Sequence, residues 1–226
     1  MARSARILLP ETPLHLVQRG NNRGTCFQFL GDARRYLEFL DEARKLNQVD
    51  IHAYVLMTNH IHLLATPRSD AEGISQMMKQ LGQRYAQYFN HRHQRTGGLF
   101  EGRYHSCLIG EEAYLFACYR YIEMNPVRAG MVKEPAEYRW SSYHANALGV
   151  ADPLVVPHSA YLASGQDPSA RQRQYRRLFM DPLSAATLED IRHQTRSGHA
   201  FASEAFRDRL AQRLGSDPEA SPRIIR

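Results

Sequence analysis

The chain has 226 residues, of which 43% are hydrophobic and 23% charged, and its 29 basic and 23 acidic residues give a net charge of +6. These values are typical of one globular domain, or of one domain with a small appendage, and exclude a disordered or fibrous protein. No run of about 18 apolar residues is present, so we expect no membrane span. The apolar stretch within the first nine residues is too short for a secretory signal. The three cysteines form no CxxC pair, which disfavours disulfide and cysteine-zinc sites and favours the cytoplasm.

The basic residues are strongly biased toward arginine. Lys45, Lys79 and Lys133 are the only lysines among the 29 basic residues. Because arginine binds phosphate groups bidentately, the bias suits a nucleic-acid partner. Codon usage in a GC-rich genome explains the bias almost as well.

Hydrophobic periodicity and turn residues predict an alternation of strands and helices in the first part of the chain. In chain order we expect a strand over 14–19, a helix capped by Asp32, a hairpin of strands over 51–57 and 60–66, a long helix from Ser69 or Asp70, a strand over 103–109, and a helix from about Glu111 to Glu123 or Asn125, stopped by Pro126. This order predicts an α+β fold, with a ferredoxin-like antiparallel sheet and helices on one face.

The character of the chain changes near residue 150. We expect a catalytic domain over 1–148, a linker rich in proline and glycine over 149–168, and over 169–226 a small helical appendage with a flexible tail. The appendage is expected to form three short helices, over 170–180, 187–196 and 203–214. Four arginines of the first helix indicate either a nucleic-acid-binding surface or an ordinary solvated one.

His60 and His62 are separated by one residue on the predicted second strand of the hairpin. Side chains two apart on a strand point to the same face, so both imidazoles project together and can hold a divalent metal. Taken alone, an HxH triplet is more often a pair of half-buried polar residues than a pair of ligands.

Tyr121 and Asn125 are four residues apart on the predicted last helix, so their side chains are neighbours on one face. Leu115, Tyr119 and Ile122 form the apolar stripe of this helix, which makes Tyr119 the better core residue and Tyr121 the better candidate for a functional hydroxyl. A tyrosine hydroxyl has a pKa near 10 and needs a metal or a base to act as a nucleophile. A cation on His60, His62 and the amide of Asn125 would polarise a phosphodiester for attack by Tyr121.

Five segments together resemble one known family. They are Val17–Arg23 (VQRGNNR), Tyr54–Leu64 (YVLMTNHIHLL), Leu99–Tyr104 (LFEGRY), Tyr119–Gly130 (YRYIEMNPVRAG) and Trp140–Tyr143 (WSSY). In this combination and order, over about residues 5–148, the chain resembles the HUH single-strand transposases with one catalytic tyrosine, in the branch of REP-associated tyrosine transposases within the insertion-sequence-200-like type.

The resemblance implies that His60 and His62 are metal ligands, that Tyr121 is the nucleophile, and that Asn125 completes the metal site. It also implies Mg²⁺ or Mn²⁺ as cofactor, a 5′-phosphotyrosine intermediate, and single-stranded DNA with a palindromic hairpin as partner. A bacterial cytoplasmic enzyme associated with the nucleoid is expected. The sequence is equally compatible with a monomer and a homodimer.

Candidate DNA-binding residues lie in two parts of the chain. The loop after the first strand contributes Arg19, Asn21, Asn22 and Arg23, and a basic stretch with interleaved aromatic residues contributes Arg84, Arg92, Arg95 and Arg103. Cations on phosphates and rings against bases are typical of single-stranded DNA binding. The aromatic residues of that stretch, at helical spacing, fit a core better.

Two other functions share these features. A domesticated DNA-binding protein would use the same surface without chemistry, but it would not need the set of His60, His62, Tyr121 and Asn125. A rolling-circle initiator or relaxase shares the chemistry, and the single-tyrosine helix without a helicase-like extension favours a transposase.

Overall fold

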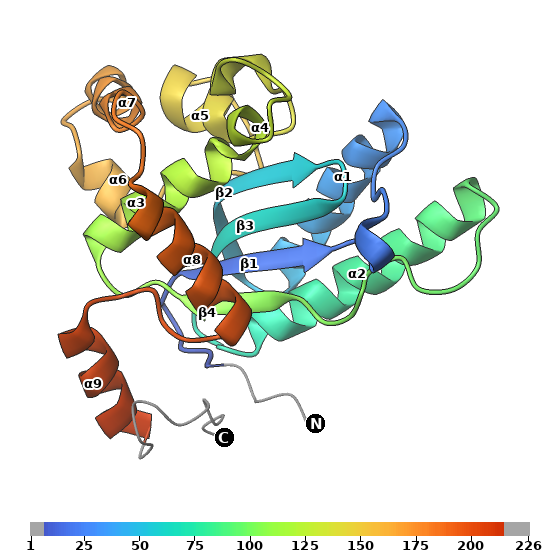
Figure 1. Ribbon diagram of the computed structural model, residues 1–226, viewed down its shortest axis with the longest axis horizontal. Helices are drawn as coiled ribbons and strands as arrows, with labels where there is room; N and C mark the ends of the chain where they lie inside the picture. The colour runs from blue at the N-terminus through green and yellow to red at the C-terminus, as the bar shows by residue number, and fades with distance from the viewer. Residues whose placement is uncertain (1–6, 215–226) are drawn as a thin grey trace.

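A computed structural model describes residues 7–214 of the chain (Figure 1). The first part contains β1 (Leu14–Arg19), α1 (Leu30–Leu46), β2 (Val49–Met57), β3 (His60–Pro67), α2 (Gly73–Arg92), β4 (His105–Leu108) and α3 (Glu112–Glu123). Beyond them follow α4 (Asn125–Arg128), α5 (Tyr143–Leu148), α6 (Ser159–Ala163), α7 (Pro168–Arg177), α8 (Ala185–Ser197) and α9 (Glu204–Leu214). Short 3₁₀ turns cover Asn21–Arg23 and Pro135–Glu137.

The strands form one sheet in the order β2-β3-β1-β4, and every neighbouring pair is antiparallel. The expected α+β fold with a ferredoxin-like antiparallel sheet is therefore confirmed. In the register of the central pair, Val17 lies opposite His62 and Arg19 lies opposite His60. The first strand thus places its odd-numbered side chains beside the two histidines of β3.

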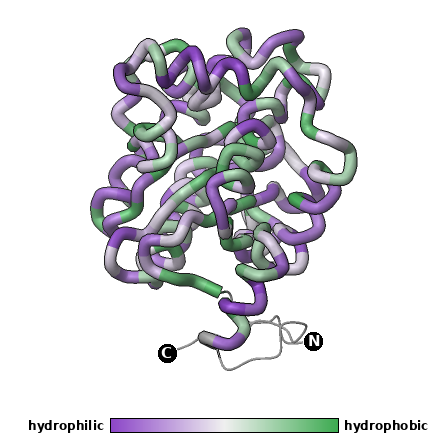
Figure 2. Tube along the Cα trace, turned by 90° about the vertical axis from the view of Figure 1, so that its left-hand side faces the viewer, coloured by the Kyte–Doolittle hydropathy of each residue, from purple (hydrophilic) through white to green (hydrophobic). Residues whose placement is uncertain are grey.

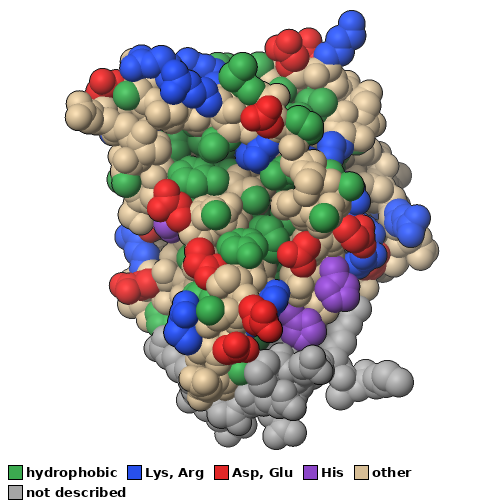
Figure 3. Space-filling view, turned by 60° about the vertical axis from the view of Figure 1, so that its left-hand side comes forward, with side chains coloured by type: hydrophobic (Ala, Val, Ile, Leu, Met, Phe, Trp, Pro, Cys, Tyr) green, Lys and Arg blue, Asp and Glu red, His purple; other side chains and the backbone are tan. Residues whose placement is uncertain are grey.

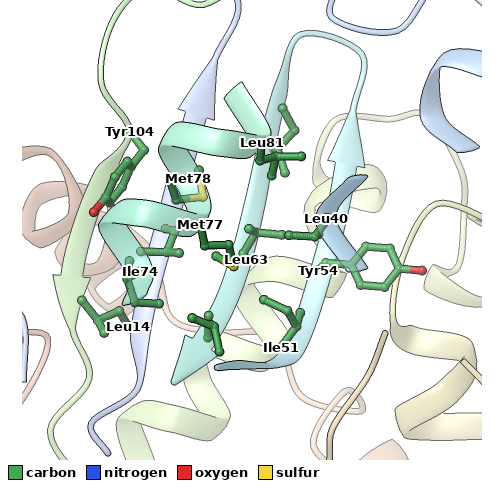
Figure 4. Packing of buried hydrophobic residues seen from close by; sticks show 14 of the residues in the cluster. Leu14, Leu40, Ile51, Tyr54, Leu63, Ile74, Met77, Met78, Leu81 and Tyr104 are labelled. Carbon is green, nitrogen blue, oxygen red and sulfur yellow. The ribbon is translucent and has the colours of Figure 1, made fainter. Parts of the chain in front are cut away.

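Helices α1 and α2 cover one face of the sheet. Figure 4 shows side chains of α2 pointing onto the strands. The residues of this core include Leu14, Leu40, Ile51, Leu63, Ile74, Met77, Met78 and Leu81. Tyr85 and Phe89 of α2 are also fully buried here, which confirms that these two aromatic residues serve the core.

The other face of the sheet is covered by α3 and by helices of the C-terminal part. Its core contains Val55, Leu64 and Cys107 from the strands and Ile109 directly after β4, together with Leu115, Tyr119, Tyr175 and Ile191 from α3, α7 and α8. The expectation of helices on one face of the sheet holds for α1 and α2 but is incomplete, because a second layer of helices covers the opposite face. The strands carry apolar side chains toward both faces, so the second face needs this cover. In Figure 2, hydrophobic segments cross the middle of the molecule.

Several element boundaries differ from the expected ones. Helix α1 begins two residues before Asp32, which is therefore not the N-cap residue. Asp32 caps the helix from within its first turn, because its carboxylate accepts the backbone N–H groups of the N-cap residue Phe29 and of Gln28, each at 2.9 Å. Helix α2 begins only at Gly73, because Asp70 forms a turn by accepting the backbone N–H of Glu72 at 2.9 Å. The fourth strand is shorter than expected, and α8 begins earlier, at Ala185.

Helix α3 ends at Glu123, one of the two expected ends, but the helical path continues past Pro126. Following a break at Met124, the chain makes one more turn as α4, with Pro126 in its first turn. Proline is accepted there because the N–H that it lacks would have no partner within the helix. This extra turn carries Arg128 back toward Tyr121 of α3.

The segment 149–168, expected to be a linker, packs along the edge of β2. The backbone N–H of Val156 donates to Ile51 O at 2.7 Å, and Val156 O accepts Nδ1 of His52 at 2.7 Å. Arg44 of α1 donates to Pro153 O at 2.6 Å. The segment also contains α6, and thereby joins the first part of the chain to α7.

Helix α7 contains the four arginines singled out in the sequence, and it lies at the top of Figure 1. Arg171 donates to Gly165 O and Arg176 to Ala147 O, so both anchor the helix to preceding segments. Arg177 donates to Gln174 of the same helix. In Figure 3 basic side chains gather along the upper edge of the molecule, above a surface with interspersed acidic and basic residues.

Helix α8 crosses in front of β1 and β4 in Figure 1, and it contacts both strands. None of the helices within residues 7–214 combines the length and apolar character needed to cross a membrane. The flexible tail expected at the C-terminal end lies outside the described residues.

Candidate active site

A pocket of about 530 Å³ opens where β1, β3, α3 and α8 meet. It is lined by His15, Val17, Arg19, His60, His62, Glu101, His105, Tyr121, Asn125, Arg192, Thr195 and Arg196. The structure therefore brings together all four residues that the sequence singled out for chemistry. The antiparallel pairing of β1 with β3 supplies the floor, and α3 and α8 supply the walls.

His60 begins β3 directly after the turn at Asn59. Its Nδ1 lies 2.7 Å from Asn59 Oδ1, and the amide of Asn59 is oriented by a 3.1 Å hydrogen bond from its Nδ2 to Arg23 O. Nδ1 of His60 is therefore the donor, since the oxygen of Asn59 can only accept. This arrangement leaves Nε2 of His60 as the nitrogen with a lone pair for a cation.

His62 is buried, and its Nδ1 lies 2.8 Å from Nε2 of His15 on β1. The rings of His15 and His62 are nearly parallel, with centroids 5.0 Å apart. The other nitrogen of His15 lies 3.0 Å from Thr195 Oγ1 on α8. The two ligand candidates therefore differ in support, because His60 is held by a neighbouring side chain and His62 by a chain of residues from β1 and α8.

Burial keeps these imidazoles neutral at pH 7. It lowers the pKa of His15 to about 3 and that of His60 to about 4, with Arg19 contributing to the latter. The pKa of His62 lies well below its ordinary value, chiefly through burial and then through the neighbouring histidines and arginines. A neutral imidazole is the form that binds a metal ion, so the site needs no proton release from these rings.

Tyr121 is buried on α3 between the histidines and a guanidinium group. The rings of His15 and His62 are steeply inclined to the Tyr121 ring, at 75° and 78°, with centroid distances of 5.6 and 5.7 Å. Cζ of Arg128 lies 4.5 Å from the centroid of the Tyr121 ring, and Arg128 also donates a hydrogen bond to Tyr121 O. Burial lowers the pKa of Arg128 to about 10, which leaves it charged at pH 7.

Asn125 lies one turn after Tyr121 and lines the same pocket. Its Nδ2 donates to Tyr121 O at 3.3 Å, and this bond leaves Oδ1 as an acceptor. Pro126 follows directly, so the side chain of Asn125 sits at the break between α3 and α4.

These groups fit a divalent cation by their chemistry. Within residues 7–214, no group of three His, Cys, Asp or Glu side chains is arranged to hold a metal. The candidate set consists instead of the Nε2 atoms of His60 and His62 and the Oδ1 atom of Asn125. Imidazole nitrogen with amide oxygen is a donor set that divalent cations such as Mn²⁺ accept, with the remaining positions open to water or phosphate.

The residues expected to bind DNA are spread over two regions. Arg19 lines the pocket, and Asn21, Asn22 and Arg23 are exposed in the turn that follows it. The tight path of this turn requires Gly20, because a Cβ there would lie 2.1 Å from Gly24 O.

The remaining expected DNA-binding residues lie farther along the chain. Arg95 lines a second pocket of about 270 Å³, which Asn21 also lines. Arg84 pairs with Glu42 at 2.5 Å, and Arg92 pairs with buried Asp32 at 3.3 Å, so these two already have acidic partners. Arg103 is exposed in the loop before β4.

Several pocket residues escaped the sequence reasoning. The sequence analysis does not single out His15, although its alternation with Leu14 and Leu16 on β1 places it on the face of the histidine pair. Arg128 lies within the motif Tyr119–Gly130 but two residues after Pro126, which was expected to stop the helix. Arg192, Thr195 and Arg196 carry no local signal, because only the docking of α8 brings them to the pocket.

Comparison with known proteins identifies a matching sequence family and a similar solved structure. The sequence model described as "Transposase IS200 like" matches residues 10–125, just over half of the chain. Among solved structures, the chain is similar to a REP-associated tyrosine transposase bound to a REP hairpin, with 18% identity and a TM-score of 0.52 over 71% of this chain and 96% of that chain. A candidate transposase from Deinococcus radiodurans is 18% identical, with a TM-score of 0.37 over 50% of this chain and 91% of that one. No curated protein matches.

Proposed function

The chain belongs to the family of IS200-like transposases, and we propose that it cleaves and rejoins single-stranded DNA through Tyr121 with the help of a divalent cation. The observation that carries this proposal is the convergence of His60, His62, Tyr121 and Asn125 on one pocket. A protein that only binds DNA has no need for a hydroxyl nucleophile beside two neutral imidazoles.

In the proposed step, Oη of Tyr121 attacks the phosphorus of a phosphodiester. The bond between Oη and phosphorus forms, and the bond between phosphorus and the 3′ oxygen breaks. The phenol loses its proton and the released 3′ oxygen takes one up, which leaves a free 3′-OH. The product is a 5′-phosphotyrosine that keeps the energy of the broken bond. Attack by a second 3′-OH reverses the step and rejoins the DNA.

The chain's own groups orient this step. The imidazoles of His15 and His62 and the guanidinium of Arg128 all contact the Tyr121 ring and restrict its position. A cation such as Mg²⁺ or Mn²⁺, when bound by His60, His62 and Asn125, would polarise the phosphate and stabilise the charge of the leaving oxygen.

Exposed arginines around the pocket suit a DNA backbone. Arg19 projects from the end of β1, and Arg192 and Arg196, which both pair with exposed Glu189, line the pocket from α8. We propose that these cations contact phosphates and that the turn at Asn21–Arg23, together with Arg95, contacts the strand beyond the site. The proposed substrate is a single strand that folds into a palindromic hairpin. We also propose that the enzyme works in the bacterial cytoplasm, at the nucleoid, where a DNA substrate of this kind is found.

The test is the variant Tyr121→Phe with a labelled hairpin oligonucleotide and Mn²⁺. We expect it to lose cleavage and the covalent protein–DNA adduct, while the Kd for the hairpin stays within about 3-fold of the wild-type value, because only one hydroxyl is removed. Tyr119→Phe is the matched control. It removes the same hydroxyl two residues away, in the buried core rather than the pocket, and should leave cleavage intact.

Two results would contradict the proposal. Cleavage by the Tyr121→Phe variant at the wild-type rate would exclude Tyr121 as the nucleophile. A wild-type protein that binds the hairpin but forms neither nick nor adduct with any divalent cation would favour a DNA-binding protein without strand transfer.

A further inference from the structure

A chain of buried hydrogen bonds connects α8 to the His62 side chain. It runs from Ile191 O to Thr195 Oγ1, from Thr195 to Nδ1 of His15, and from Nε2 of His15 to Nδ1 of His62, with distances of 2.7, 3.0 and 2.8 Å. His15, His62, Ile191 and Thr195 are all buried. The chain joins residues 180 positions apart and ends outside the family match at 10–125.

The direction of every bond follows from the single hydroxyl hydrogen of Thr195. A backbone carbonyl can only accept, so Thr195 donates to Ile191 O, and its hydroxyl oxygen is left with two lone pairs. One lone pair accepts Nδ1–H of His15, and the other faces Cys107 Sγ at 3.5 Å, whose S–H can donate. His15 therefore carries its proton on Nδ1 and has its lone pair on Nε2.

The same logic fixes the tautomer of His62. Because Nε2 of His15 is an acceptor, Nδ1 of His62 must carry the proton and donate it. The lone pair of His62 is then on Nε2, the nitrogen that is not engaged with His15. Outer partners that hold a histidine ligand in one tautomer are a general feature of metal sites.

We propose that Thr195 and His15 are positioning residues that lock His62 in the Nδ1–H tautomer, so that α8 is a structural part of the active centre. The inference rests on the proposed function only in one respect, namely that the free Nε2 of His62 binds a divalent cation. Helix α8 contributes twice, because Thr195 supports the ligand from behind while Arg192 and Arg196 line the pocket in front.

Nitrogen-15 NMR of the histidine side chains in metal-free protein at pH 7.5 tests the tautomers directly. Signals of His15 and His62 are assigned by their loss in His15→Gln and His62→Gln variants. In the wild-type protein we expect both rings to be protonated on Nδ1. Protonation of His62 on Nε2 in the wild-type protein would overturn the proposal.

Three variants on α8 separate positioning from simple packing. Thr195→Val keeps the shape but removes the hydroxyl, so His15 loses its acceptor and both rings should show mixed tautomers. Thr195→Ser restores a hydroxyl and should restore the wild-type spectrum. Thr187→Val makes the same change at the start of the same helix, where the hydroxyl contacts Ser184, and should leave the histidine spectrum unchanged.

Titration with Mn²⁺, followed by electron paramagnetic resonance, adds a second readout without DNA. We expect Thr195→Val to bind Mn²⁺ about 10- to 100-fold more weakly than the wild type, and Thr195→Ser and Thr187→Val to bind within about 3-fold of it. Wild-type tautomers and wild-type affinity in Thr195→Val would overturn the inference. Absence of Mn²⁺ binding by the wild type, with the expected tautomers, would instead contradict the proposed metal site and leave the lock of His62 supported.

Discussion

At the residue scale, the charged group that contacts Tyr121 is the guanidinium of Arg128. Arg128 lies over the face of the ring at 4.5 Å and is bound to the backbone oxygen of the same residue. A guanidinium fixed beside a hydroxyl stabilises negative charge that develops there, and it does so without reorganisation during the reaction. In the proposed reaction, Arg128 would therefore both hold the Tyr121 ring and stabilise charge that forms near it during the attack.

The variant Arg128→Ala should slow cleavage of a hairpin oligonucleotide about 100-fold in single-turnover experiments at saturating DNA, which is the cost typical of losing one such electrostatic group. Arg128→Lys keeps the charge but not the planar group, so an intermediate rate is expected. Arg139→Ala is the matched control, because Arg139 also lies over an aromatic ring, that of Trp140 at 4.7 Å, outside the pocket. Cleavage by Arg128→Ala at the rate of this control would show that the cation has no role in the step.

At the scale of elements, helix α3 is held by a buried carboxylate. Glu123 accepts hydrogen bonds from Ser142 Oγ at 2.6 Å, from Asn146 Nδ2 at 3.0 Å and from Tyr175 Oη at 2.8 Å. Burial raises its pKa from 4.5 to about 7, against the lowering effect of these three donors. The helix that carries Tyr121 is therefore tied to α5 and to α7 of the C-terminal part through one side chain.

This network predicts a pH-dependent effect of Tyr175→Phe. The folded-state pKa of Glu123 is raised, so its contribution to stability is full at acidic pH and is lost as pH rises through about 7. Tyr175 limits this loss by donating to the ionised carboxylate, and such a bond is stronger than a neutral one. The variant should lower the free energy of unfolding by about 2 kcal/mol at pH 8 and by about 1 kcal/mol at pH 5.5, measured by urea denaturation.

Tyr161→Phe is the control for this comparison. Tyr161 lies in the same core, and its hydroxyl donates at 2.8 Å to a neutral acceptor, the backbone oxygen of Asn146. Tyr161→Phe should therefore lower the free energy of unfolding by the same amount at both pH values. Equal costs of Tyr175→Phe at pH 5.5 and pH 8 would mean that Glu123 does not change its charge in this interval.

Local pattern sufficed to predict the four strands and helices α1, α2 and α3, though not all of their ends, and to single out the four residues that meet in the pocket. Two histidines on one strand face and a tyrosine one turn before an asparagine are set by the periods of strand and helix, which the sequence displays directly. The support of His62 is different in kind, because Thr195 reaches His15 only after α8 has docked on β1 and β4. Arg128 was missed for a local reason, since Pro126 opens a new helical turn instead of ending the old one.

At the scale of the molecule, the C-terminal part forms one body with the predicted catalytic domain. Tyr175 and Ile191 lie in the same core as Leu64 of β3 and Ile109, which follows β4, and Phe201 forms an isolated β-bridge with Ile109. An independent appendage on a linker would unfold separately from the domain that bears it. The shared core makes one cooperative transition the expected behaviour.

Urea denaturation followed by two probes tests this cooperativity. Trp140, the single tryptophan, lies beside β2, where its backbone oxygen accepts the N–H of Leu56 at 2.9 Å, so its fluorescence reports on the sheet. Far-UV circular dichroism reports on all helices, those of the C-terminal part included. We expect the two transitions to coincide in midpoint and slope. A loss of helical signal at lower urea, completed before the fluorescence changes, would show that the part beyond residue 149 folds as a separate unit, and α8 would then be no fixed wall of the pocket.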